Sequence, residues 1–241
     1  MNTIEKRTIG EYVTADFRTA ALFSKHKIDF CCKGNRTLEE VCQSKGLNLE
    51  EIEKEIISAL HSGTTSEMDY ASFSPTLLID YILEKHHSYI KEKTPTLLLY
   101  LDKLCKVHGD RHPELFEIQQ LFQDTAGELE DHLQREEQIL FPYIKAMDSA
   151  RKNHEALPVP PFGAVKNPIS LLKQDHEEAG EAFATLSELT HQYTPPTDAC
   201  ETYKVTFAML REYEQDVHKH IHLENNLLFG KAKELETSFT L

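Results

Sequence analysis

Apolar residues recur every three or four positions over most of the chain, a spacing that places them on one face of a helix. Four long segments carry this pattern, and they begin near Pro75, Pro113, Pro168 and Pro196. Their apolar positions are Leu78, Ile82, Ile90, Leu97, Leu101 and Leu104; Leu115, Ile118, Leu121, Phe122 and Leu129; Leu171, Leu172, Ala179, Phe183 and Leu186; and Phe207, Leu210, Tyr213, Val217 and Leu227. A sustained alternation of β-branched residues is absent, so the sequence predicts an all-α fold.

Turn-forming residues separate these segments where a pair of antiparallel helices would reverse. Gly109–Pro113 lies between the first two segments, and Thr194–Asp198 lies between the last two. The proline-rich stretch from Asp148 to Pro168 is long enough to cross from one helix pair to the other. We therefore expect residues 75–241 to form an up-down four-helix bundle.

The first 62 residues have a different pattern, with short helical segments separated by turns. Thr37 and Asn48 are each followed by acidic residues that suit the first turn of a helix, and Gly34 and Gly46 interrupt the chain before them. We expect residues 1–62 to form a small helical domain that bears cysteines. Residues 63–74 begin with a polar run and are expected to be a linker.

The two helix pairs repeat one order of metal-binding side chains. His132 and Glu136 recur as His220 and Glu224, and a spacing of four places ring and carboxylate about 6 Å apart on one helix face. Another histidine lies 45 residues before the first pair and 44 residues before the second. Because unpaired charges on an apolar stripe are costly, we expect a bound cation. The predicted ligands are His87, His132, Glu136, His176, His220 and Glu224.

Four imidazoles and two carboxylates exceed what one tetrahedral zinc ion needs. If each metal takes imidazoles at its ends and Glu136 and Glu224 bridge, the donors suit two iron ions. A ferritin-type site would need four carboxylates and two Glu-x-x-His pairs, whereas Glu84–His87 is the only such spacing near the site. The alternative is a buried polar cluster without a metal.

Other histidines compete for these roles. His86 also has apolar neighbours, but the surroundings of His87 match the second repeat better. His218 and His222 lie on a track that continues to polar residues, so we expect a solvated role or one outside the ligand set. His108 is a further candidate metal ligand, although 21 helical residues beyond His87 amount to about 30 Å. It would reach the site only if the helix folded back at its internal proline.

An odd number of cysteines forms neither a paired disulfide framework nor a repeated C-x-x-C zinc pattern. Adjacent Cys31 and Cys32 form a candidate thiol-transfer site, and Lys27, Lys33 and Arg36 nearby would favour thiolates. Packing of both thiols in the core of the small domain is the alternative. The five cysteines are Cys31, Cys32, Cys42, Cys105 and Cys200, and we expect the last three to be structural.

Charge and hydropathy limit the classes of partner. The formal net charge is −14, which argues against nucleic acid or an anionic membrane as a partner. No apolar run reaches transmembrane length, and the first residues do not form a secretory signal. We expect a cytoplasmic protein that binds no nucleic acid and no membrane.

These motifs resemble one family over essentially the whole chain: the hemerythrin-like iron-sulfur cluster repair proteins, called repair of iron centres or the YtfE/ScdA type. The resemblance lies in Asp29–Cys32 with Gly34, in Glu136–Pro142, in Asp175–Gly180 and in His220–Asn226. It implies a hemerythrin-like bundle with two non-haem irons bound by the six predicted ligands. It also implies carboxylate and oxo bridges between the irons, and family alignments place a histidine at His108.

The resemblance further implies repair of iron-sulfur clusters damaged by nitric oxide or oxidants, by supply of iron. The implied partners are damaged iron-sulfur proteins, with nitric oxide or dioxygen as small ligands and a homodimer as a candidate assembly. Cys31 and Cys32 would handle iron or nitrosyl groups at the recipient. The alternatives are a hemerythrin-like carrier or sensor of dioxygen or nitric oxide, and an enzyme that reduces nitric oxide.

Overall fold

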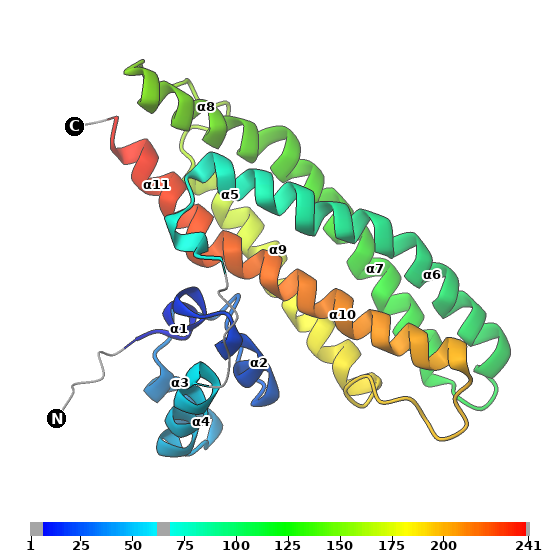
Figure 1. Ribbon diagram of the computed structural model, residues 1–241. Helices are drawn as coiled ribbons and strands as arrows, with labels where there is room; N and C mark the ends of the chain where they lie inside the picture. Colours follow the sequence, from blue (N-terminus) through cyan, green and yellow to red (C-terminus); the bar gives the residue numbers. More distant parts are fainter. Residues whose placement is uncertain (1–6, 62–67, 240–241) are drawn as a thin grey trace.

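The computed structural model describes residues 7–61 and 68–239 of the protein (Figure 1). Helices account for all its regular structure in these residues, where the only β feature is an isolated bridge between Thr8 and Thr37. The all-α prediction is therefore confirmed. Among the same residues, no helix combines the length and apolar composition needed to cross a membrane.

Four helical rods form the larger part of the molecule. Three of them contain a short π-helical turn, which is labelled η. The rods are α5 (Pro75–Ile82), η2 (Leu83–His87) and α6 (Ser88–His108); α7 (Glu114–Arg135), η3 (Glu136–Leu140) and α8 (Phe141–Asn153); α9 (Lys166–Leu189); and α10 (Glu201–Leu223), η4 (Glu224–Leu228) and α11 (Phe229–Thr237).

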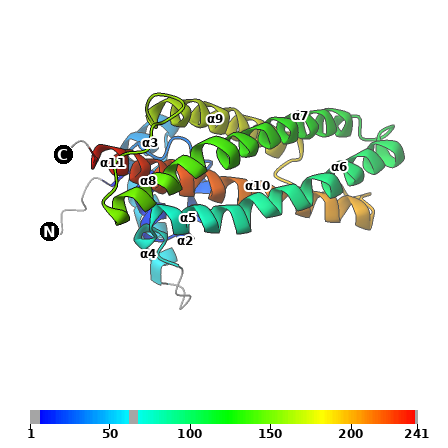
Figure 2. The ribbon, with the colours of Figure 1, turned by 90° about the horizontal axis from the view of Figure 1, so that it is seen from above.

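The rods alternate in direction and enclose a common core. Helix α6 packs against α7 and α10, and α9 packs against the same two helices from the opposite side. Figure 2 shows α5–α6 and α7–α8 as neighbouring rods along the length of the bundle. The chain reverses between α6 and α7 and between α9 and α10, where the sequence predicts turns.

The N-terminal segment forms four shorter helices beside the bundle: α1 (Ile9–Ala15), α2 (Arg18–Lys25), α3 (Leu38–Lys45) and α4 (Leu49–His61). Thr37 begins α3 with a capping box in which its hydroxyl accepts from Glu40 N and the Glu40 carboxylate accepts from Thr37 N. Asn48 accepts from the first backbone amides of α4. Both predicted helix starts are confirmed.

The predicted linker lies only partly within the described residues, because residues 62–67 are outside them. The described part includes a 3-10 turn, η1 (Tyr70–Ser72), and the Tyr70 hydroxyl lies 2.9 Å from that of Tyr81 on α5. The turn therefore packs on the bundle immediately before Pro75 begins α5.

The small helices dock where α10 meets η4. Asn225 donates to the Cys31 carbonyl at 3.1 Å, and Asn226 donates to the Phe30 carbonyl at 3.2 Å. Gly10 of α1 is close enough that a Cβ there would lie 2.7 Å from Asn226 Oδ1. Only a residue without a side chain allows this approach of α1 to η4.

Two apolar clusters fill the bundle. One contains Leu129, Leu133 and Val217 and continues into the small helices, and the other contains Ile79 and Leu140. Between them lies a buried layer of polar side chains, and that layer is the candidate metal centre.

Candidate metal centre

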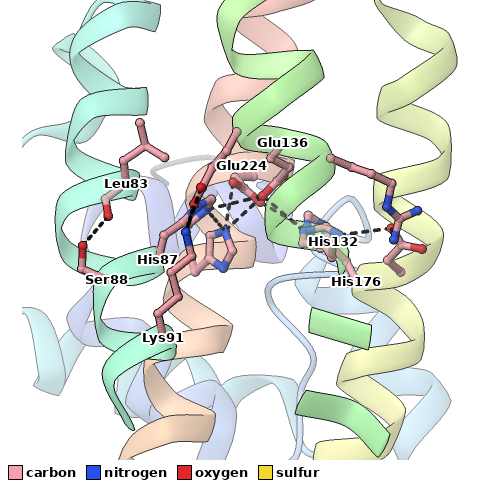
Figure 3. A network of polar contacts seen from close by, with 12 residues as sticks. Leu83, His87, Ser88, Lys91, His132, Glu136, His176 and Glu224 are labelled. Carbon is pink, nitrogen blue, oxygen red and sulfur yellow. Dashed lines mark hydrogen bonds and ion pairs between the residues drawn. The ribbon is translucent and has the colours of Figure 1, made fainter. Parts of the chain in front are cut away.

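All four rods contribute to the buried polar layer (Figure 3). His132 and Glu136 come from the rod of α7 and η3, and His220 and Glu224 come from the rod of α10 and η4. The six predicted ligands are at most 1% exposed: His87, His132, Glu136, His176, His220 and Glu224. The structure thus brings together every member of the predicted set except the candidate His108.

The six side chains form two groups of potential ligands that share both carboxylates. Within each group, the candidate ligand atoms lie within 4.8 Å of one another. One group is His87, Glu136, His220 and Glu224, and the other is His132, Glu136, His176 and Glu224. Glu136 and Glu224 therefore lie where one carboxylate can serve two neighbouring cations.

The shared carboxylates carry buried charge that protein hydrogen bonds do not satisfy. Glu224 oxygens lie 3.0 Å from His220 Nε2 and 3.2 Å from His176 Nε2, and Glu136 Oε2 lies 3.4 Å from His132 Nε2. None of the four oxygens makes a hydrogen bond of acceptable geometry. Because such burial is costly, and imidazole nitrogen with carboxylate oxygen is a donor set that iron accepts, the residues fit a metal centre.

Three of the four imidazoles are oriented as in metal sites, with Nε2 facing inward and Nδ1 bonded outward, whereas the buried Nδ1 of His220 has no partner among the described residues. His87 Nδ1 donates to Glu137 at 2.8 Å, and Glu137 is also held by Lys91. The corresponding partners are Asp175 for His132 at 3.1 Å and Asn225 for His176 at 3.1 Å. Such partners fix the ring and increase the basicity of the inward nitrogen.

Glu137, Asp175 and Asn225 are functional candidates that the sequence pattern did not predict. Each is the immediate neighbour of a predicted ligand and belongs to a motif that carries the family resemblance. Their position next to a predicted ligand was the signal that the sequence offered for these residues. Which of the neighbours reaches an imidazole ring depends on how the helices pack.

Charges inside the layer shift the ionisation of its members in the absence of a metal. Burial lowers the pKa of His132, but the Glu136 carboxylate and the hydrogen bond to Asp175 outweigh burial and raise it to about 9. In the same way Glu224 and Glu136 raise the pKa of His220 to about 10. Burial raises the pKa of Glu136, but the surrounding imidazoles hold it well below its usual range.

The π turns coincide with ligand positions. His87 is the last residue of η2, and Glu136 and Glu224 are the first residues of η3 and η4. In each turn a backbone amide donates to the carbonyl five residues earlier, as Phe141 does to Glu136. Such single-turn insertions are often found at functional sites. The sequence repeat predicted the helices but not these turns.

The two competing candidates His86 and His108 lie outside both ligand groups. His86 is buried beside the layer and pairs with Asp216 at 2.9 Å. Helix α6 continues through Pro95 to His108, so the helix does not fold back towards the site. His108 instead lies 3.2 Å from Cys200 at the end of the helix.

His222 is buried rather than solvated, so of the two predicted roles only the one outside the ligand set fits it. This ring is 2% exposed because Phe17 and Phe30 of the N-terminal segment pack against it, and burial lowers its pKa to about 4. His218 contacts Phe30 from the same side. The polar track on α10 is thus a docking face for the small helices.

Cys31 and Cys32 lie against the metal centre. Their sulfurs are 3.6 Å apart, and Cys32 donates to the carbonyl of His176 at 3.2 Å. With Asp29 they form a third group of potential metal ligands. The expected thiolate is wrong for Cys31, because its contact with Cys32 and its burial raise its pKa well above the ordinary value.

A cavity of about 130 Å³ lies beside the second ligand group, between α7 and α9. Its wall includes His132, His176 and the acidic side chains of Glu128, Asp131 and Glu178. It therefore extends to two of the inward-facing imidazoles.

Comparison with known proteins agrees with this architecture. Residues 78–232 match the hemerythrin HHE cation-binding domain, and residues 5–60 match ScdA_N, a domain of unknown function. The chain is 34% identical to the "Probable iron-sulfur cluster repair protein" of Haemophilus influenzae, over 88% of this chain and 89% of that one.

Two further relatives share nearly the full length. The iron-sulfur cluster repair protein YtfE of Escherichia coli is 33% identical over 93% of this chain and 95% of its own. ScdA of Staphylococcus haemolyticus is 31% identical over 92% of this chain and 96% of its own. The chain belongs to the YtfE/ScdA family of iron-sulfur cluster repair proteins, and its candidate metal ligands lie in a hemerythrin-type domain.

Proposed function

We propose that the protein holds two iron ions and uses them to repair iron-sulfur clusters damaged by nitric oxide or oxidative stress. The observation that carries this proposal is the pair of ligand groups that share Glu136 and Glu224. Two metals bound side by side need bridging donors, and carboxylates can shift between bridging and terminal positions.

Each residue of the layer has a distinct role in this proposal. His87 and His220 would hold one iron, and His132 and His176 would hold the other. When bound, the irons would supply replacement metal for the recipient cluster. Glu137, Asp175 and Asn225 orient the imidazoles from outside.

The N-terminal thiols are proposed as the contact with the recipient. Asn225 supports this role, because its oxygen accepts from the His176 ring while its nitrogen donates to the Cys31 carbonyl. One amide thus connects the ring of a proposed ligand to the thiol segment. Cys31 is a protonated thiol in the free protein, so binding of iron at Asp29, Cys31 and Cys32 would displace protons.

Anaerobic transfer to a nitric-oxide-damaged iron-sulfur enzyme tests the proposal. Protein loaded with two irons should restore the enzyme and lose iron in proportion. The matched variant Glu224→Gln, loaded under the same conditions, should retain less iron and restore less activity. Restoration without loss of iron would contradict iron supply. Turnover of nitric oxide without restoration would favour the reductase alternative.

A further inference from the structure

A histidine and a cysteine meet at the end of the bundle away from the metal layer. Helix α6 ends at His108, and Cys200 immediately precedes α10. Figure 1 shows the end of α6 and the start of α10 at the same end of the molecule. The 21 residues of α6 separate this end from His87 by about 30 Å.

The two side chains form a hydrogen-bonded pair with a defined direction. His108 Nε2 lies 3.2 Å from Cys200 Sγ, and the His108 ring is buried. On its other side, Arg111 Nη2 lies 3.3 Å from His108 Nδ1. Because a guanidinium only donates, Nδ1 must accept, and the ring hydrogen is then on Nε2 and points at the sulfur.

Neighbouring groups hold this arrangement in place. Arg111 is fixed by Asp198, whose carboxylate lies 2.6 Å from Nη1. Tyr203 packs edge-on against the His108 ring at 5.4 Å. Cys200 is also the N-cap residue of α10, a helix of 23 residues, where unpaired backbone amides face the cap.

The other four cysteines lie in environments where the sulfur donates a hydrogen bond or is buried. Cys32 and Cys105 donate to the backbone carbonyls of His176 and Leu115. Cys31 donates to Asp29, and burial raises the pKa of Cys42. Cys200 is the one cysteine that is classed as exposed and whose sulfur faces a ring N–H donor.

We propose that Cys200 is a nucleophilic thiol that exchanges with low-molecular-weight disulfides and is positioned by His108. Cys200 releases its proton to solvent, and the resulting thiolate attacks one sulfur of the disulfide, forms a new S–S bond and breaks the old one. The departing half leaves as a thiolate and takes a proton from solvent. Cys200 is oxidised and the departing half is reduced, so the reaction needs no other oxidant.

The test uses the full-length folded protein with oxidised glutathione and with an aromatic disulfide reagent. Peptide mass spectrometry of quenched samples should find Cys200 modified first, about tenfold faster than any other cysteine. The iron content should remain that of the unmodified protein. Equal rates at Cys200 and Cys32, or a rate at Cys200 no higher than in urea-unfolded chain, would overturn the proposal without any variant.

Two substitutions of His108 distinguish a role in positioning the Cys200 thiol from a role in stabilising the fold. His108→Leu removes the donor and should slow the exchange about tenfold, whereas His108→Gln retains an N–H donor and should recover part of the rate. Both variants should show the thermal midpoint of the parent within a few degrees. If His108→Leu folds and exchanges at the parent's rate, the histidine has no role in the reaction.

Discussion

At the scale of single residues, histidine side chains occupy three different environments. His87 directs Nε2 into the metal layer and Nδ1 to Glu137. His222 is buried among aromatic rings with its pKa lowered to about 4 by burial. His108 pairs with a thiol. Residue type alone does not distinguish these roles. The carboxylates and rings that surround each histidine distinguish them.

The first prediction compares His87→Gln with His108→Gln. Loss of the inward nitrogen at residue 87 removes a terminal ligand, so this variant should purify anaerobically with fewer than two irons per chain. The His108 variant, which lies outside both ligand groups, should retain the parent's iron content. Colorimetric iron analysis provides the measurement. Equal iron loss in both variants would be incompatible with the proposed ligand set.

The second prediction concerns Asp175, which accepts from the His132 ring and also pairs with Arg135. Asp175→Ala should weaken metal binding about 10- to 100-fold, because the His132 ring loses its outer partner. Glu178→Ala is the control, since Glu178 lies on the same helix and lines the same cavity without touching a ring through any hydrogen bond the structure shows. Competition with a chelator measures both variants. An unchanged affinity in Asp175→Ala would remove its proposed role.

At the scale of helices, apolar periodicity was sufficient for the rods, turn-forming residues for the reversals, and capping residues for the starts of α3 and α4. The repeated order of His and Glu also predicted which six polar side chains would meet, since it aligned the two helix pairs. The π turns were not predictable in this way, because a single residue inserted in a helix leaves the apolar spacing nearly intact. The small helices pack over His222 through tertiary contacts. The polar residues on the same face of α10 did not indicate this packing.

The third prediction tests whether a π turn is required for the metal centre. Gln138 is exposed in the middle of η3, and deleting it should convert the turn to ordinary helix while both flanks retain their packing. Glu136 and Glu137 would then shift relative to the rings that they contact, so iron binding should fall sharply while circular dichroism remains that of a helical protein. Gln138→Ala, which preserves the chain length, should bind iron like the parent. A deletion variant with two tightly bound irons would disprove the requirement.

At the scale of the whole molecule, the polar layer divides the bundle core into two apolar clusters, so its charge state affects global stability. Without metal, His132 and His220 have pKa values raised to about 9 and about 10, above the ordinary value of about 6.5. Groups raised in this way stabilise the fold fully below about pH 6.5. That contribution is lost as the pH rises through 9 to 10.

The fourth prediction follows from these two values. The thermal midpoint of metal-free protein should decrease between about pH 6.5 and pH 10. Metal binding should show the opposite trend, since the metal must displace protons from these imidazoles and binds better as pH rises. Calorimetric titration with ferrous iron in buffers of different ionisation enthalpy measures the released protons. A midpoint of metal-free protein that rises over this range would contradict the assigned pKa directions.

The fifth prediction separates iron storage in the bundle from transfer through the N-terminal segment. Cys31 and Cys32 lie outside both groups of the metal layer but contact it through His176 and Asn225. The double variant Cys31→Ser with Cys32→Ser should therefore retain the parent's iron content and its reaction with nitric oxide. Because serine hydroxyls are much poorer ligands for iron and for nitrosyl groups, the variant should restore a damaged iron-sulfur enzyme more slowly.

Cys200→Ser is the matched control, since it removes a thiol at the opposite end of the bundle and should repair at the parent's rate. The rate of recovery of the damaged enzyme, measured anaerobically with equal iron loading, distinguishes the outcomes. If the double variant repairs as fast as the parent, the paired thiols serve only to pack the small helices against α9 and η4. Iron would then have to leave the bundle by a path that does not involve them, and the cavity between α7 and α9, which extends to His132 and His176, is the route that the described residues provide.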